Sequence, residues 1–251
     1  DGELHPQVGA LVVELGDPPQ LVPFCSGTLI SPTVFLTAAH CFQAFDAFGI
    51  EEFWVILSNK VDASATLLTG TSHVATGANS GGLNDPLDLA VVALDAAVTS
   101  VTPAQLPTLG LLNETALREQ TFTPVGYGTT RDTQQGGFKS LFDNFDRRYA
   151  TQSFLALQKA WLVLSMNPAT GSGGTCYGDS GGPHFLGGTS SNLIVSLTVT
   201  GDAVCKATDK TYRLDTVGAR AFLDDFVLGA LGSPAIQRTQ AWLDRHLPSN
   251  D

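Results

Sequence analysis

Short runs of hydrophobic residues recur along most of the chain, separated by glycine, proline, asparagine and aspartate. Such runs between turn-forming residues predict β-strands rather than helices. Six runs lie in the first part of the chain, at residues 8–13, 25–30, 34–37, 53–57, 67–69 and 89–94. Six more follow at residues 122–128, 154–156, 160–165, 183–186, 193–198 and 212–214. We therefore predict an all-β protein with a first lobe at 1–103, a connector at 104–121 and a second lobe at 122–251.

The end of the chain changes to a helical period. Hydrophobic residues at 222, 223, 226 and 227 fall on one face of a helix. A second set, hydrophobic except for Thr239, follows Gly232-Ser233-Pro234 at positions 235, 236, 239, 242, 243 and 247. This spacing predicts two C-terminal helices.

Composition and charge exclude several classes of partner. The 251 residues are 43% hydrophobic, but no apolar stretch reaches the roughly 20 residues that a membrane-spanning helix needs. The net charge is −11, and residues 1–103 hold eleven acidic residues against Lys60 alone. Because phosphate binding needs clustered lysine and arginine, we expect no nucleic-acid partner and no anionic membrane. No charged-then-apolar signal opens the sequence, so an exported chain would already have lost its leader.

Three residues in three separate motifs suggest nucleophilic catalysis. Ser180 lies in Gly-Asp-Ser-Gly-Gly-Pro, and His40 lies in Thr-Ala-Ala-His-Cys. A serine hydroxyl is a weak nucleophile unless a neutral imidazole takes its proton and a carboxylate orients that imidazole. Asp88, at the start of the apolar run 88–94, fits the carboxylate because a buried strand would shield it from water. Asp85, in the polar stretch before it, fits a turn.

At these residues the chain resembles the chymotrypsin-like (trypsin-fold) serine endopeptidases, in which the same motifs follow in the order His, Asp, Ser. The resemblance implies two six-stranded antiparallel Greek-key β-barrels with the active site between them. It also implies acyl-enzyme hydrolysis by His40, Asp88 and Ser180 without a metal or an organic cofactor. The same resemblance implies protein or peptide substrates and protein protease inhibitors as further partners. It also implies a monomeric state.

The resemblance assigns further roles around Ser180. Gly178 and Ser180 would offer the backbone N–H groups of an oxyanion hole, and Ser196 would hydrogen-bond the carboxylate of Asp88. The specificity pocket would be formed by four residues, Gly174, Thr175, Thr198 and Lys210. Gly174 stands where trypsins carry an aspartate, and Thr198 replaces a glycine, so we predict a preference for small or medium uncharged residues. Lys210 is expected to be solvated; in the pocket it would instead favour an acidic residue.

The four cysteines allow three pairings by sequence alone. The resemblance implies Cys25 with Cys41 and Cys176 with Cys205, and hence a secreted or periplasmic protein. Four reduced thiols or a metal site are the alternative, although the spacings match no zinc pattern. His5, His73, His184 and His246 also lie in no metal-ligand spacing, and we expect them at the surface or in turns. Asn113-Glu114-Thr115 is a glycosylation sequon.

Asp179, next to the predicted nucleophile, requires its own explanation. In family members that are activated by cleavage, a new N-terminal ammonium pairs with this aspartate. The chain opens with Asp1-Gly2-Glu3-Leu4-His5, which differs from the family's Ile-Val-Gly-Gly-like end. We therefore predict that an internal cation or a set of hydrogen-bond donors holds Asp179, with Arg147 and Arg148 as candidates, and that the loop forms without N-terminal cleavage.

Two other functions remain open. Gly178–Gly182 also satisfies G-x-S-x-G, the motif of α/β-hydrolases, and His246 could complete the order Ser, Asp, His in an esterase. That fold requires strands alternating with helices, which the hydrophobic pattern does not show. The second alternative is a catalytically silent relative that acts as a binding module.

Overall fold

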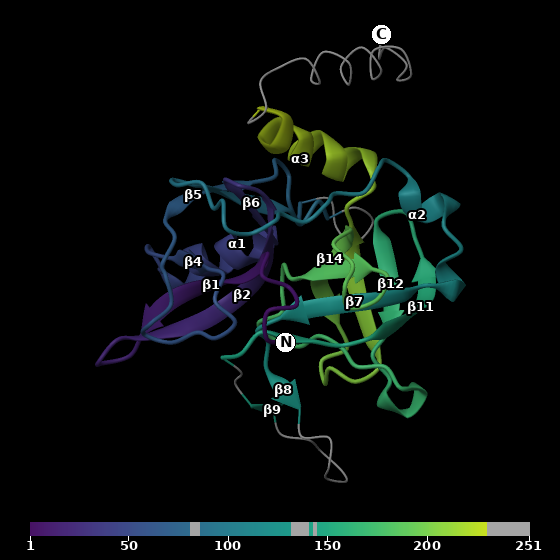
Figure 1. Cartoon of the computed structure of the whole chain (residues 1–251), viewed down its shortest axis with the longest axis horizontal. Helices are drawn as coiled ribbons and strands as arrows, with labels where there is room; N and C mark the ends of the chain where they lie inside the picture. Colours follow the sequence, from purple (N-terminus) through teal and green to yellow (C-terminus); the bar gives the residue numbers. More distant parts are fainter. Residues whose placement is uncertain (81–85, 132–140, 143–144, 230–251) are drawn as a thin grey trace.

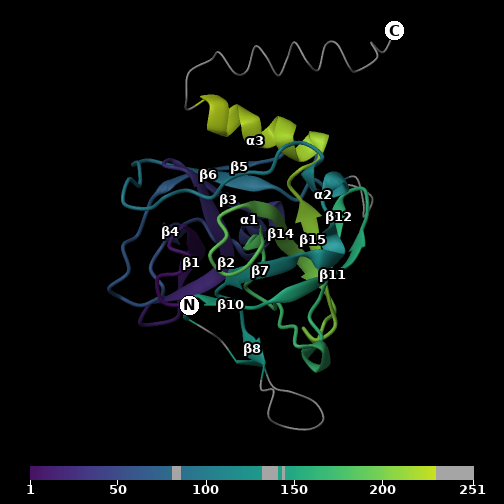
Figure 2. The same cartoon turned by 45° about the vertical axis from the view of Figure 1, so that its right-hand side comes forward.

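A computed structural model describes residues 1–80, 86–131, 141–142 and 145–229. Two β-sheets lie side by side, the first built from the purple and blue half of the chain and the second from the teal and green half (Figures 1 and 2). Helix α3 (Val217–Gly229) lies across the end of the first sheet that carries β5 and β6 in both views. The predicted all-β class with two barrel-like lobes and a C-terminal helix is thus confirmed. The second predicted helix and His246 lie outside the described residues, as does Asp85.

The first sheet has six antiparallel strands in the order β4-β1-β2-β3-β6-β5. The strands are β1 (Val8–Leu15), β2 (Gln20–Ser31), β3 (Val34–Thr37), β4 (Trp54–Ile56), β5 (Gly70–Val74) and β6 (Ala90–Leu94). The strand predicted at 67–69 is displaced: Leu68 makes only an isolated bridge to Val55, and the regular pairing with β6 begins at Gly70. That bridge brings the two edges of the sheet together.

The second sheet is closed because β13 pairs with both β14 and β7. Its strands are β7 (Thr121–Gly126), β10 (Arg148–Tyr149), β11 (Gln152–Leu157), β12 (Trp161–Ser165), β13 (Pro183–Leu186), β14 (Ile194–Gly201) and β15 (Thr208–Arg213). A two-stranded ribbon, β8 (Thr130–Arg131) with β9 (Leu141–Phe142), stands apart from it. Helix α2 (Leu111–Glu114) and the 3₁₀ turn η2 (Leu117–Glu119) lead into β7, and the 3₁₀ turn η3 (Pro168–Thr170) follows β12. Among the described residues the strands of both sheets follow one another without crossover helices, which excludes the α/β-hydrolase alternative.

The hydrophobic run after the predicted base forms a helix that the strand pattern did not predict. Helix α1 (Ala39–Phe48) buries Phe42 and Phe45, which lie three residues apart and therefore share one face. Phe53 packs against both rings at centroid distances of 5.2 and 5.8 Å. The helix ends at Gly49, whose left-handed φ of 66° is the usual glycine terminator.

One hydrophobic core runs from the first sheet into the second. It includes Leu29, Phe35 and Val91 from the first sheet and Leu197 and Tyr212 from the second, all fully buried. A continuous core of this kind resists sliding of the two sheets against each other, because their side chains interdigitate. Among the described residues, no helix is long and apolar enough to cross a bilayer.

Candidate active site

His40 and Asp88 come from different elements and meet at the start of α1. The Nδ1 atom of His40 lies 2.7 Å from Oδ2 of Asp88, and the backbone N–H of His40 donates to Oδ1 at 2.8 Å. The second contact satisfies one of the free amides at the helix N-terminus, where Ala38 provides no side-chain cap. Because a carboxylate only accepts hydrogen bonds, the proton is placed on Nδ1 and the lone pair of Nε2 stays free.

Asp88 is held as a carboxylate. It is only 2% exposed, and this burial by itself would raise its pKa. The hydrogen bonds and charge of His40, together with the amide of Asn79 at 3.2 Å, outweigh the burial and keep the pKa of Asp88 below its usual value. The support from Asn79 was not predicted. Ser196, which the resemblance placed there, instead accepts a hydrogen bond from Thr211 at 2.8 Å, and no described contact joins it to Asp88.

The loop that carries Ser180 lies directly against the segment that carries His40. The backbone N–H of Ser26 donates to the carbonyl oxygen of Ser180 at 2.9 Å. Gly181 approaches so closely that a Cβ atom there would lie 2.7 Å from the backbone nitrogen of Ala38. Within the described residues the Ser180 hydroxyl has no hydrogen bond, and such contacts are often long in an enzyme without substrate.

Two backbone amides beside Ser180 point to no protein acceptor. Neither the N–H of Gly178 nor that of Ser180 donates to any described residue. Gly178 has a φ of 93°, a conformation that favours glycine. These two amides are therefore available to an oxyanion, and the oxyanion-hole role that the resemblance gave to this pair stays a prediction.

Asp179 is compensated by backbone amides and not by an arginine. Its two carboxylate oxygens accept from Gly128 N–H and Cys176 N–H, each at 2.8 Å. Burial raises the pKa of Asp179 to about 6, because these hydrogen bonds only partly offset the lost hydration. The expected set of hydrogen-bond donors is present, but the choice of Arg147 and Arg148 is wrong.

Both arginines have other partners. Arg147 is fully buried and its Nε donates to Oδ1 of Asp1 at 2.9 Å, while its remaining donors bind backbone carbonyls of Gly2, Val8 and Leu57. Arg148 is exposed, and its Nη2 atom lies 3.9 Å from Oδ2 of Asp146.

A pocket of about 300 Å³ lies beside this loop and includes Gly174 and Thr175 in its wall. Met166 fills the space that a side chain at position 174 would need, since a Cβ atom there would lie 2.6 Å from Cβ of Met166. Thr198 and Lys210 are not part of this wall. Thr198 is buried, and its backbone accepts a hydrogen bond from the N–H of Gly181 and donates one to the carbonyl of Gly182. The Nζ of Lys210 lies 4.2 Å from the centre of the Trp161 ring.

Asp209 is a buried acid behind the pocket wall that the sequence analysis did not single out. Its Oδ2 contacts Thr175 Oγ1 at 2.8 Å, Gln152 Nε2 at 2.8 Å and His184 Nε2 at 2.9 Å. His184 is completely buried, and His5 is 1% exposed and bonded to Asp1. The expectation of surface positions is therefore wrong for both histidines, which are buried because each has a carboxylate partner. His73 is exposed, as expected.

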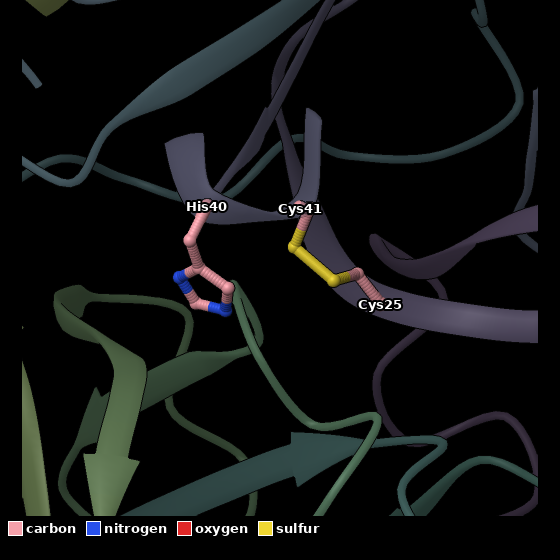
Figure 3. A group of neighbouring side chains, drawn as sticks. All are labelled: Cys25, His40 and Cys41. Carbon is pink, nitrogen blue, oxygen red and sulfur yellow. A yellow bond between two sulfur atoms is a disulfide. The ribbon is translucent and has the colours of Figure 1, made fainter. Parts of the chain in front are cut away.

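The four cysteines form the two disulfides that the resemblance implied, Cys25–Cys41 and Cys176–Cys205. Figure 3 shows the first one beside the ring of His40. Cys25, Cys41 and His40 are also the one group among the described residues whose ligand atoms are close enough for a metal ion. Both sulfurs are committed to the disulfide, and a metal needs thiolates, so this group does not fit a metal. Asn113, of the sequon, is exposed and accepts from Arg213 at 3.1 Å.

Comparisons with known proteins agree with this geometry. The Trypsin family model matches residues 6–214. Brachyurin from Leptuca pugilator is 31% identical over 207 residues, which cover 77% of this chain and 86% of that protein. Chymotrypsin from Phaedon cochleariae is 27% identical over 197 residues, covering 75% of this chain and 67% of that protein. Among solved structures, human heparin binding protein has a TM-score of 0.66 at 20% identity, covering 92% of this chain and 95% of that one, and this likeness concerns the fold. Because the family model spans most of the sequence, the chain belongs to the trypsin family of serine proteases.

Proposed function

We propose that the protein is an extracytoplasmic serine endopeptidase that cleaves peptide bonds through an acyl-enzyme. The observation that carries the proposal is the pairing of His40 with the buried Asp88 beside the loop of Ser180 and its two unpaired amides. Both disulfides support a secreted or periplasmic location, because such bonds persist in oxidising compartments.

In the proposed reaction, Nε2 of His40 takes the hydroxyl proton while Oγ of Ser180 attacks the carbonyl carbon of the substrate. Asp88 stabilises the imidazolium that forms, and the N–H groups of Gly178 and Ser180 bind the oxyanion. The imidazolium then protonates the leaving amine. Water, deprotonated by the same imidazole, hydrolyses the ester at Ser180 and restores the free hydroxyl. No step needs a metal or an organic cofactor.

Labelling with a serine-directed phosphonate tests this proposal. We expect one label per chain at Ser180, and none in Ser180→Ala. Ser180→Ala should lose several orders of magnitude in turnover on a peptide substrate while keeping the fold. A folded wild-type protein that neither labels nor cleaves would instead support a binding module. Full activity of Ser180→Ala, or loss of wild-type activity in EDTA, would refute the mechanism.

We also propose a preference for small or medium uncharged residues before the cleaved bond. Gly174 and Met166 bring no charge to the pocket wall, to which Arg148 and Asp179 add one basic and one acidic side chain, and the hydroxyl of Thr175 is committed to Asp209. Lys210 is directed to Trp161 and lies outside this wall, so it is not placed to select an acidic residue. Cleavage of a peptide mixture tests the preference: predominant cleavage after arginine, lysine, aspartate or glutamate would contradict it.

A further inference from the structure

Ser26, on strand β2 of the first sheet, makes two hydrogen bonds to the loop of Ser180 and two to neighbouring segments. Its hydroxyl donates to the carbonyl oxygen of Gly178 at 2.9 Å and accepts from the N–H of Tyr127 at 3.0 Å. Its own N–H donates to the carbonyl oxygen of Ser180 at 2.9 Å, and its carbonyl accepts from Thr37 Oγ1 at 2.8 Å. Ser26 is completely buried, so water cannot replace any of these contacts.

The direction of the hydroxyl bond is fixed by its partners. The N–H of Tyr127 can only donate, and the carbonyl of Gly178 can only accept. The hydroxyl hydrogen of Ser26 must therefore point at Gly178. The side chain joins β7's end to the oxyanion loop through a single oxygen atom, and this oxygen comes from the other sheet.

The hydrogen bond from Ser26 to Gly178 can affect catalysis because it lies between the two oxyanion-binding amides of the loop. The amide of Gly178 shares its peptide plane with the carbonyl of Tyr177, which accepts from Thr129 N–H at 2.7 Å. The amide of Ser180 shares its plane with the carbonyl of Asp179, which accepts from Gly182 N–H at 2.8 Å. The plane between these two contains the carbonyl of Gly178, which accepts from Ser26 Oγ, and the N–H of Asp179, which donates to the carbonyl of Cys176 at 3.0 Å. Without the bond from Ser26, the central plane is held only on its N–H side, and the two outer planes gain freedom to rotate relative to each other.

Glycine at 178 makes the central bond necessary. A residue with a φ of 93° and no side chain has a large conformational freedom, so the loop does not fix its own geometry there. The Ser26 side chain is also packed closely against two glycines. A Cβ atom on Gly126 would lie 2.8 Å from Ser26 Oγ, and one on Gly182 would lie 3.1 Å from Ser26 Cβ.

We infer that Ser26 is a positioning residue, whose hydroxyl aligns the two oxyanion-binding amides of Gly178 and Ser180 from the opposite sheet. This inference rests on the proposed peptidase function. Ser26 touches no reacting atom, and acts through the peptide plane between Gly178 and Asp179. Its loss should therefore weaken binding of the transition state more than binding of the substrate.

The test compares Ser26→Ala with Thr28→Val, a control on the same strand whose buried hydroxyl has no partner among the described residues. Active sites are first counted by phosphonate titration, so that unfolded protein does not enter the rates. We expect kcat per titrated site on a peptide amide to fall about tenfold in Ser26→Ala with KM within twofold, less than the hundredfold or more typical of deleting an oxyanion donor. Affinity for a peptide boronic acid, whose adduct places an oxygen between the two amides, should fall in parallel. Thr28→Val should match the wild type in both measurements.

A kcat per site unchanged in Ser26→Ala, or an equal fall in Thr28→Val, would overturn the inference. Should Ser26→Ala fold poorly, Ser26→Gly removes the same hydroxyl with less bulk and is expected to show the same split between kcat and KM. Failure of the proposed function is separate, because it would appear in the wild type as absence of labelling and turnover.

Discussion

The carboxylate of Asp88 has a second support, Asn79, whose contribution can be isolated at the level of one residue. The Nδ2 atom of Asn79 bridges Oδ1 of Asp88 at 3.2 Å and Oε1 of Gln43 at 3.1 Å. A hydrogen bond to a charged group contributes about 1.5 kcal/mol, and about 1.4 kcal/mol corresponds to a factor of ten in rate. Asn79 is exposed, so we expect kcat/KM of Asn79→Ala to fall by about threefold to tenfold. Gln43→Ala removes only the other partner and should stay near the wild type; equal losses in the two variants would argue against a role of Asn79 through Asp88.

The depth of the pocket depends on Met166. Its side chain lies 2% exposed against Gly174, where it fills part of the wall. Met166→Ala should enlarge the pocket, so that the ratio of kcat/KM for leucine or phenylalanine over alanine before the cleaved bond rises about tenfold. The cavity also costs about 2–5 kcal/mol of stability, and profiling therefore has to be done below the unfolding temperature. Met166→Leu conserves volume and should keep the wild-type profile. An unchanged profile in folded Met166→Ala would show that another residue limits the pocket.

At the scale of elements, the two disulfides hold different parts of the site. Cys25–Cys41 ties β2 to the first turn of α1, next to His40, and Cys176–Cys205 ties the loop of Ser180 to the segment between β14 and β15. The loops contain 16 and 29 residues, for which the chain-entropy estimate is about 3 kcal/mol or slightly more. Replacing either pair by alanine should therefore lower the free energy of unfolding by similar amounts.

The kinetic effects of the two replacements should differ. Loss of Cys25–Cys41 loosens the turn that carries the base, and we expect mainly a lower kcat. Loss of Cys176–Cys205 removes two residues of the pocket wall, and we expect mainly a higher KM. Steady-state kinetics together with urea unfolding measures both quantities, and peptide mapping without reduction first verifies the pairs. Identical changes in kcat and KM would mean that the disulfides act only through global stability.

The elements also show what the sequence could predict and what it could not. The motifs around His40, Asp88 and Ser180 depend on short contiguous stretches, and the structure brings these stretches together as expected. Strand β5 is mostly exposed, and its sequence has no alternating apolar pattern. Only its pairing with β6 defines it as a strand, so the hydrophobic residues at 67–68 led to a strand predicted too early in the chain. The burial of His184 and Arg147 depends on carboxylates 25 and 146 positions away, which no local pattern reveals.

At the scale of the whole molecule, two buried groups with opposite pKa shifts act on stability over the same range of pH. The pKa of Asp179 is raised from 3.8 to about 6, mainly by burial. Between these values the folded chain keeps a proton that the unfolded chain has released, so the free energy of unfolding falls as the pH rises. The pKa of His5 is lowered from 6.5 to about 4, mainly by burial and then by the charge of Arg147. There the unfolded chain binds the extra proton, and the free energy of unfolding rises with pH.

The two slopes oppose each other between about pH 4 and 6, and single replacements should therefore expose each one. Relative to the wild type, Asp179→Asn should become progressively more stable as the pH rises from 4 to 6, since its side chain no longer titrates. His5→Gln should become progressively less stable over the same range, because it loses the group that favours folding at higher pH. Urea midpoints at several pH values measure both differences, and taking them against the wild type cancels the other carboxylates. A difference in the free energy of unfolding between variant and wild type that does not change with pH reflects lost contacts, so only the pH-dependent part of the difference is compared. If both variants stay parallel to the wild type across this range, then neither buried group changes its proton affinity on folding.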